Sequence, residues 1–159
     1  RDRSVSRGLG DVYKRQIKFR HTMPVQIRFS DVDQFGHMNN SVYFSLYDLA
    51  KTTYIKDVLG SADWSKLAIV VANINANFFM PVFFSDHLVI ETAVVHLGHK
   101  SFTLLQRAVT TDTHEVKCEC RTVMVGYDLA TKEPKLISED YKEAICRYEE
   151  KTLEELSKG

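Results

Sequence analysis

Residues 31–43 hold the side chains of this sequence whose types and spacing could do chemistry. Two acids, Asp31 and Asp33, are followed by Gly36, His37 and a pair of asparagines, and the cluster lies between an alternating apolar run and a long amphipathic run. A positioned carboxylate can act as a nucleophile or as a general base that activates water. Because loops between rigid elements often carry function, the cluster is a candidate reactive site; the alternative is an elaborate helix cap.

The helix that follows would complete such a site. Asn39 or Asn40 predicts its N-cap, and the first helical turn leaves N–H groups without intrahelical partners at the positive end of the helix dipole. Donors of this kind stabilise a negative charge that develops on a substrate oxygen. Gly36 would let the backbone approach a substrate without an intervening side chain.

Four residues of the cluster each have two interpretations. His37 lies four residues after Asp33, so it could orient that carboxylate or contact a substrate, or it could be a structural histidine that bonds to loop backbone. Asn39 could contact a substrate or serve only as a cap. Tyr43 could line a pocket, but we expect it in the core, and Asp31 could be the reacting carboxylate or could cap the turn after the first strand.

Hydrophobic periodicity predicts the elements that position the cluster. Residues 24–29 alternate, with Val25, Ile27 and Phe29 on one face, which is typical of a half-buried strand. A helix is expected over 40–59, with one broad buried face. The apolar stripe of this helix consists of Val42, Leu46, Leu49, Ala50, Thr53 and Val58, widened by Tyr43, Tyr47 and Tyr54.

The rest of the chain predicts four more strands and a final helix. The strands are expected over 69–80, 87–97, 101–111 and 115–127. Short turns between the last three of them indicate an antiparallel meander. Ser138 is expected to cap the final helix, and the heavily charged stretch over 149–159 is expected to fray as a tail.

Composition bounds the class of protein. The 159 residues are 44% hydrophobic and 26% charged with a formal net charge of zero, as in one soluble globular domain without an electrostatic case for nucleic acid. No apolar run approaches the roughly 20 residues that span a bilayer, and no signal peptide is recognisable, so we expect a cytoplasmic protein without a membrane partner. Three cysteines and scattered histidines show no zinc spacing; neither a metal nor a cofactor is expected.

The first 16 residues differ from the rest. They carry five Lys or Arg against two Asp and have no sustained hydrophobic period. We hypothesise that 1–16 is a non-native leader; the alternative is a disordered basic arm. The expected organisation is therefore this leader, one domain over 17–148 and the charged tail over 149–159.

One long helix and several strands with one apolar face each are most simply buried when an antiparallel sheet curls around the helix. We therefore expect an α+β protein in which five strands wrap around one long central helix, followed by a C-terminal helix. A single helix wrapped by a sheet is the description of the hotdog fold.

The residues over 31–43 resemble the D-x-D-x-x-G-H-x-N-N-x-x-Y signature of the 4-hydroxybenzoyl-CoA thioesterase-like acyl-CoA thioesterases, which have the hotdog fold. The order of elements agrees from about residue 23 to about residue 141. Residues 98–102 also resemble the G-x-K-S-F turn between the third and fourth strands of that family. The resemblance covers most of the chain.

The resemblance implies hydrolysis of an acyl-CoA thioester to a free acid and coenzyme A. The catalytic carboxylate of the family is the second acid of the pair, which is Asp33 here, and both the nucleophilic and the general-base mechanism stay open. Hotdog proteins commonly pair their second strands across a dimer, so a homodimer or homotetramer is expected. The candidate site is Asp33, Gly36 and His37 for catalysis, with Asn39, Tyr43, Lys100 and Ser101 for substrate binding.

Two other functions on the same fold remain as alternatives. The hydratases of acyl thioesters place Asp and His five positions apart with Asn and Pro between them, whereas Asp33 and His37 are four apart and enclose neither. The dehydratase pattern does not fit around His37 either. A non-catalytic acyl-CoA-binding protein would be expected to lack the acid or to carry a DNA-binding domain.

Overall fold

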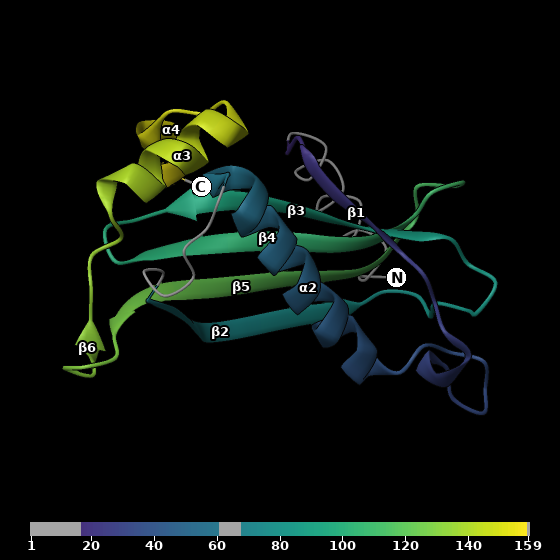
Figure 1. Ribbon diagram of the computed structural model, residues 1–159. Helices are drawn as coiled ribbons and strands as arrows, with labels where there is room; N and C mark the ends of the chain where they lie inside the picture. Colours follow the sequence, from purple (N-terminus) through teal and green to yellow (C-terminus); the bar gives the residue numbers. More distant parts are fainter. Residues whose placement is uncertain (1–16, 61–67, 159) are drawn as a thin grey trace, which may run out of the picture.

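The computed structural model describes residues 17–60 and 68–158, and the expected leader over 1–16 lies outside them. A long helix crosses one face of a curved antiparallel sheet (Figure 1). The elements are β1 His21–Val25, the 3₁₀ turn η1 Phe29–Asp31, α2 Asn40–Leu59, β2 Ile69–Phe78, β3 Leu88–Leu97, β4 Ser101–Thr110, β5 Val116–Asp128, β6 Glu133–Pro134, α3 Glu139–Glu149 and α4 Leu153–Lys158.

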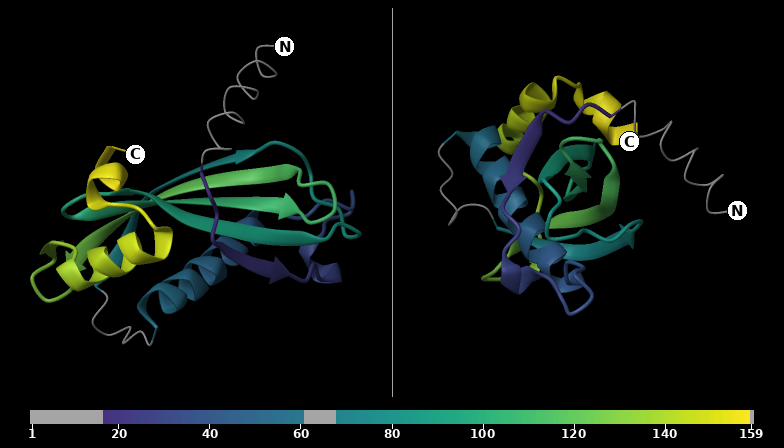
Figure 2. Two further views of the ribbon diagram at one scale, coloured as in Figure 1. Left: turned by 90° about the horizontal axis from the view of Figure 1, so that it is seen from above. Right: turned by 90° about the vertical axis from the view of Figure 1, so that its right-hand side faces the viewer.

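The sheet has the strand order β1-β3-β4-β5-β2, and every pair is antiparallel. The end-on view in Figure 2 shows how strongly it curls around the side on which α2 lies. The predicted meander β3-β4-β5 and the α+β hotdog architecture are confirmed. Over residues 17–60 and 68–158 the sheet has six strands rather than five, because the two-residue β6 pairs with the end of β5.

The first strand was expected over 24–29 and lies earlier, at His21–Val25. Asp31 explains the shift, since its carboxylate accepts the backbone N–H of Arg28 at 2.8 Å while its own N–H donates to the Arg28 carbonyl at 2.9 Å. These local bonds replace a strand ladder with a 3₁₀ turn. Phe29, expected inside, is 83% exposed.

Helix α2 was predicted within one residue, but its buried face is rotated from the expected stripe. Leu49, expected inside, is 56% exposed. The tyrosines that were expected only to widen the stripe are its centre, since Tyr43, Tyr47 and Tyr54 are at most 2% exposed and their large rings bury much apolar surface. The buried residues of α2 are Tyr43, Tyr47, Ala50, Lys51, Tyr54 and Ile55.

Two groups of buried side chains fill the space between α2 and the sheet. The group around the second half of α2 includes Tyr54, Phe102, Met124, Tyr141 and Ile145. The group around its first half includes Met38, Tyr43, Tyr47, Ile90 and Cys118. The second of these groups lies directly beneath the polar cluster, so the loop that carries Asp33 rests on a packed core.

The C-terminal stretch was expected to fray, and it forms a helix instead. Thr152 and Glu155 make a reciprocal capping box, in which the Glu155 side chain accepts the Thr152 N–H and the Thr152 hydroxyl accepts the Glu155 N–H, both at 3.1 Å. Leu156 of this helix, α4, is fully buried against the core. The prediction gave weight to the many charged residues of this stretch and overlooked Leu156, the apolar residue that packs against the core.

A buried polar cluster joins β1, α2 and α3. The imidazole of His21 is buried, with Nε2 at 3.0 Å from Asp57 Oδ2 and its ring 5.6 Å from that of Tyr54. The Tyr54 hydroxyl donates to Glu149 at 2.5 Å. Burial lowers the pKa of His21, against the opposing effect of Asp57, and burial raises the pKa of Glu149.

This cluster predicts a pH-dependent stability. An unfolded chain takes up a proton at His21 near pH 6.5, whereas the folded protein resists it, so stability is lost as pH falls below about 6.5. The raised pKa of Glu149 acts in the opposite direction, with stability gained as pH falls. Thermal unfolding from pH 7.5 to 5.5 should therefore show a smaller loss of Tm in His21→Gln than in the wild type. His99→Gln, at an exposed histidine, is the control. An equal loss of Tm with pH in all three proteins would contradict the role given to His21.

Candidate active site

The segment that carries Asp33 is a tight loop closed by short backbone bonds. The Asp33 N–H donates to the His37 carbonyl at 2.8 Å, and the Gly36 N–H donates to the Asp33 carbonyl at 2.9 Å. Val32 and Met38 pair as an antiparallel bridge across the loop. The chain can turn here because Gly36 has φ +79°, a backbone conformation that residues with a side chain rarely adopt.

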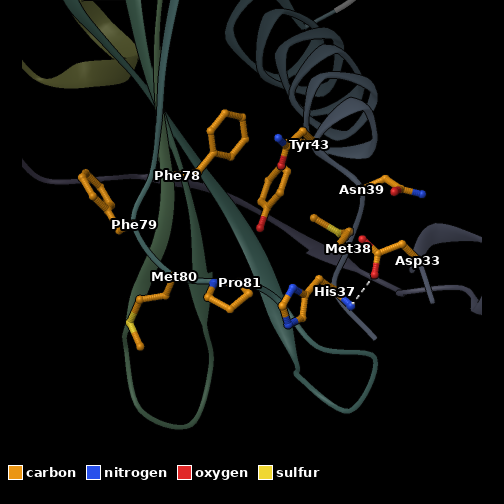
Figure 3. Close-up of a pocket in the computed structure, with 10 residues that line it drawn as sticks. Asp33, His37, Met38, Asn39, Tyr43, Phe78, Phe79, Met80 and Pro81 are labelled. Carbon is orange, nitrogen blue, oxygen red and sulfur yellow. Dashed lines mark hydrogen bonds between the residues drawn. The ribbon is translucent and has the colours of Figure 1, made fainter. Parts of the chain in front are cut away.

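The carboxylate of Asp33 is held by one oxygen and open at the other. Oδ1 accepts the backbone N–H groups of Phe35 at 2.9 Å and His37 at 3.2 Å, the second of which is the dashed line in Figure 3. Nothing in the described part of the chain donates to Oδ2. The side chain is exposed. An oriented carboxylate with one free oxygen is the arrangement that a nucleophile or a general base requires.

Asp31 has the opposite environment, although it lies only two residues earlier. Its side chain is buried, accepts the Arg28 N–H, and forms an ion pair with the Arg28 guanidinium at 3.6 Å. Its carbonyl accepts the Asn39 N–H at 2.9 Å. Asp31 thus holds the loop and the helix start together, which matches its expected role as a cap.

Helix α2 begins beside Asp33 with unused donors. Asn39 occupies the N-cap position, but its side chain makes no capping hydrogen bond, so the expected cap is present in backbone geometry only. The N–H groups of Asn40 and Ser41 have no acceptor within the described residues. They are therefore available, together with the positive helix end, to an anionic oxygen.

A cavity of about 360 Å³ opens between the start of α2 and the end of β2 (Figure 3). Tyr43 is buried in its wall with its ring 5.3 Å from that of Phe78, so it belongs to the core and lines the cavity at once. Burial raises the pKa of the Tyr43 phenol, which stays protonated at neutral pH. The lining residues are Asp33, His37, Met38, Asn39, Asn40, Tyr43, Phe78, Phe79, Met80 and Pro81.

Met80 and Pro81 in this wall were not singled out in the sequence as site residues. In the sequence, Pro81 indicated only where the preceding strand ends, although a chain that leaves a strand at a proline can also line a site. The backbone N–H groups of Phe79 and Met80 both donate to the Lys117 carbonyl, at 2.9 and 3.2 Å, and this turns the chain out of β2 toward the Asp33 loop.

The imidazole of His37 does not bond to the carboxylate of Asp33. Its ring packs edge-on against Phe83 at 5.1 Å and is tilted against Phe35 at 6.5 Å, and its backbone is what contacts Asp33. His37 lines the cavity. The acid–imidazole pair that a hydratase would use is not formed between these two residues.

Lys100 and Ser101 lie far from this cavity. Ser101 pairs with Val125, while Ala108, seven residues further along β4, pairs with Cys118 and through it with the Phe78 end of β2. Seven residues of strand span roughly 23 Å. Figure 1 shows the β3–β4 turn and the η1 loop at opposite ends of the sheet. Within one copy of the chain, the two expected substrate contacts are not brought to Asp33.

Two further observations concern partners. In the described part of the chain, no helix has the length and apolar character needed to cross a membrane. Over the same residues, no three His, Cys, Asp or Glu side chains form a group that could hold a metal ion.

Known proteins that are similar to this chain include several thioesterases. Long-chain acyl-CoA thioesterase FadM of Escherichia coli is 26% identical over 124 residues, which are 76% of this chain and 93% of FadM. A crystal structure of a Thermus thermophilus thioesterase complexed with coenzyme A and Zn has a TM-score of 0.75 and 26% identity, covering 85% of this chain and 98% of that one. A 4-hydroxybenzoyl-CoA thioesterase complexed with 4-hydroxybenzoyl-CoA shares the fold, with a TM-score of 0.69, 21% identity and coverage of 78% and 96%.

The sequence model of the thioesterase-like superfamily matches residues 27–145, well over half of the chain. This range includes the Asp33 loop, α2, the four long strands β2 to β5 and most of α3. The protein belongs to the thioesterase-like superfamily.

Proposed function

We propose that this protein is an acyl-CoA thioesterase that hydrolyses the thioester to a free acid and coenzyme A. The observation that carries the proposal is the junction at Asp33. A carboxylate with one free oxygen stands beside the open N–H groups of a helix start, at the mouth of a cavity. The relatives named as thioesterases support the same chemistry.

The chemistry follows from what a thioester needs. Its carbonyl is already electrophilic, so Asp33 acts either by attacking it directly or by taking a proton from the attacking water. The oxygen that becomes negative is stabilised by the N–H groups of Asn40 and Ser41. Either route consumes one water and releases one carboxylic acid and one coenzyme A thiol.

The other residues of the site have supporting roles. Gly36 gives the loop the φ that aims Asp33 at the cavity. His37 and Asn39 line the polar side of the cavity, and Tyr43 forms its floor as a neutral phenol. His37 acts through its backbone N–H on Asp33 and through its ring as cavity wall.

A second copy of the chain completes the substrate site. Strand β2 is an edge of the sheet with no second strand partner among the described residues, and an exposed apolar row runs along its helix-facing side and the adjoining start of α2. A long, apolar, unpaired edge strand tends to pair with another chain. The exposed side chains of this row are Phe44 of α2 and Val71, Ile74 and Phe78 of β2.

Antiparallel pairing of two β2 strands places the Ile69 end of one copy beside the Phe78 end of the other. The turn that carries Lys100 and Ser101 lies at the Ile69 end, as the register through Val125 shows. A homodimer thus brings these two residues toward the Asp33 cavity of the other copy, where a cation can meet the phosphates of coenzyme A. A tetramer would consist of two such dimers.

The three cysteines are free, and two of them are buried in the core. Free thiols in a packed interior are compatible with the reducing cytoplasm, which we propose as the location.

A panel of acyl-CoA substrates tests the function. Full-length protein should release free thiol, detected with a thiol reagent, from at least one of a set of short, long and aromatic acyl-CoA thioesters. The matching acyl amides should release no carboxylic acid, because an amide carbonyl is far less electrophilic than a thioester carbonyl. Absence of thiol release across the whole panel would overturn the proposal.

A further inference from the structure

A second hollow lies beside Asp33, separate from the cavity lined by Tyr43. It encloses about 550 Å³, a volume in the range of roughly 300 to 1,000 Å³ found for small-molecule sites. Phe29 of η1 and Phe84 of the β2–β3 connection form its walls, with their rings edge to face at 6.2 Å. Its lining residues are Phe29, Val32, Asp33, Gln34, Gly36 and Phe84.

The walls of this hollow are exposed aromatic side chains. Phe29 is 83% exposed and Phe84 is 51% exposed, and Phe35 and Phe83 nearby are exposed as well. Phenylalanines grouped in this way are uncommon on a protein surface and mark a place where apolar material binds. Two segments that lie far apart in the sequence supply them, so the group is a product of the fold.

The two hollows share one residue, Asp33. A thioester whose carbonyl sits at Asp33 has two arms, the acyl chain and the pantetheine, and these leave the carbonyl in different directions. The cavity beside Tyr43 is lined by the side-chain amides of Asn39 and Asn40, which suit the amides of pantetheine. The second hollow has one charged side chain in its lining, Asp33 itself, at its edge.

We infer that the hollow between Phe29 and Phe84 is the acyl-chain site of this enzyme, and that it selects apolar acyl groups of medium or greater length. The inference rests on the proposed thioesterase function. Each methylene that leaves water for this hollow adds up to about fourfold in affinity. A two-carbon acyl group is too short to extend from Asp33 along Phe29 and Phe84 and gains little.

The test compares acetyl-CoA and dodecanoyl-CoA as substrates of the full-length protein. The wild type should show a higher kcat/KM for dodecanoyl-CoA than for acetyl-CoA. Phe29→Ser and Phe84→Ser should each reduce the ratio of kcat/KM for dodecanoyl-CoA to kcat/KM for acetyl-CoA by about 10-fold, because the acyl chain loses contact with one aromatic ring. Leu153→Ser removes an exposed apolar side chain on α4, which packs on β3 away from Asp33, and should leave the ratio unchanged.

Other outcomes would overturn the inference. An equal loss of kcat/KM with both substrates would mean that the two phenylalanines bind coenzyme A or support the loop. Wild-type kcat/KM with both substrates would mean that they do not contact the acyl chain. A lower oligomer mass of the variants in light scattering would make the hollow a subunit interface.

Failure of the proposed function is distinguishable, because the wild type would then hydrolyse neither substrate. Binding by calorimetry decides the inference in that case. Dodecanoyl-CoA should still bind more tightly than coenzyme A alone, and Phe29→Ser and Phe84→Ser should still remove the difference; equal affinities in the wild type would overturn the site.

Discussion

Asp33→Asn should reduce kcat for acyl-CoA hydrolysis by about 100- to 10,000-fold, the usual contribution of a positioned catalytic base. The amide oxygen of an asparagine can still accept the N–H groups of Phe35 and His37, so the loop keeps its shape. The amide can neither attack a carbonyl nor take a proton from water. We therefore expect KM, Tm and oligomer mass close to those of the wild type, with the loss confined to kcat.

Asp31→Asn is the matched control, since the same change is made two residues away in a different environment. The substitution weakens the ion pair with Arg28 and leaves a buried amide in place of a carboxylate. A loss of about 1–3 kcal/mol in unfolding free energy is expected, with kcat reduced far less than in Asp33→Asn. Wild-type turnover in Asp33→Asn, with turnover lost in Asp31→Asn at unchanged Tm, would reverse the assignment of the two acids.

Much of the fold followed from periodicity. The four long strands β2 to β5 and helix α2 were predicted within about two residues, because each has one face against the core and turn residues at its ends. Ser138 does cap α3, with its hydroxyl accepting the Tyr141 N–H at 3.2 Å. Where periodicity failed, a specific polar side chain was responsible. Asp31 converts the end of an apolar alternation into a 3₁₀ turn, and that leaves Phe29 outside.

Side-chain partners explain the remaining differences in the fold. The buried face of α2 is centred on three tyrosines, and the hydroxyl of one of them, Tyr54, donates to Glu149, which lies 95 residues later. The last helix was signalled by Thr152 and Glu155 at capping-box spacing, a pattern that the surrounding charges obscured.

The loop that carries Asp33 could be predicted from the sequence, but the more distant residues and the hollows of the site could not. Asp33, Gly36 and His37 lie within five residues, and local backbone bonds hold them together, so their proximity could be predicted from spacing. Lys100 and Ser101 were named by resemblance, and one copy of the chain cannot bring them to Asp33. The two hollows that meet at Asp33 depend on packing between distant segments, which no local pattern encodes.

Ile74→Lys should convert the proposed homodimer into a monomer and abolish most thioesterase activity. Ile74 lies near the middle of β2 and is 45% exposed on its helix-facing side, outside both hollows. A lysine on an edge strand opposes pairing with another chain. Light scattering should show half the wild-type mass, and kcat/KM should fall although Asp33 is intact, because Lys100 and Ser101 of the second copy are lost. Leu153→Lys, at an equally exposed site on α4, which packs on β3 across the sheet from this edge, should change neither.

The twofold symmetry of such a dimer gives a sharper form of the experiment. When two identical antiparallel strands overlap fully, a residue at the centre lies beside its own twin, so the two lysines introduced by Ile74→Lys would repel each other across the interface. An equimolar mixture of Ile74→Lys and Ile74→Glu chains places opposite charges there. The mixture should recover the dimer mass and most of the activity, while each variant alone does not. A monomeric variant with full activity, or a mixture that stays monomeric, would contradict the pairing of β2 strands as the arrangement that completes the site.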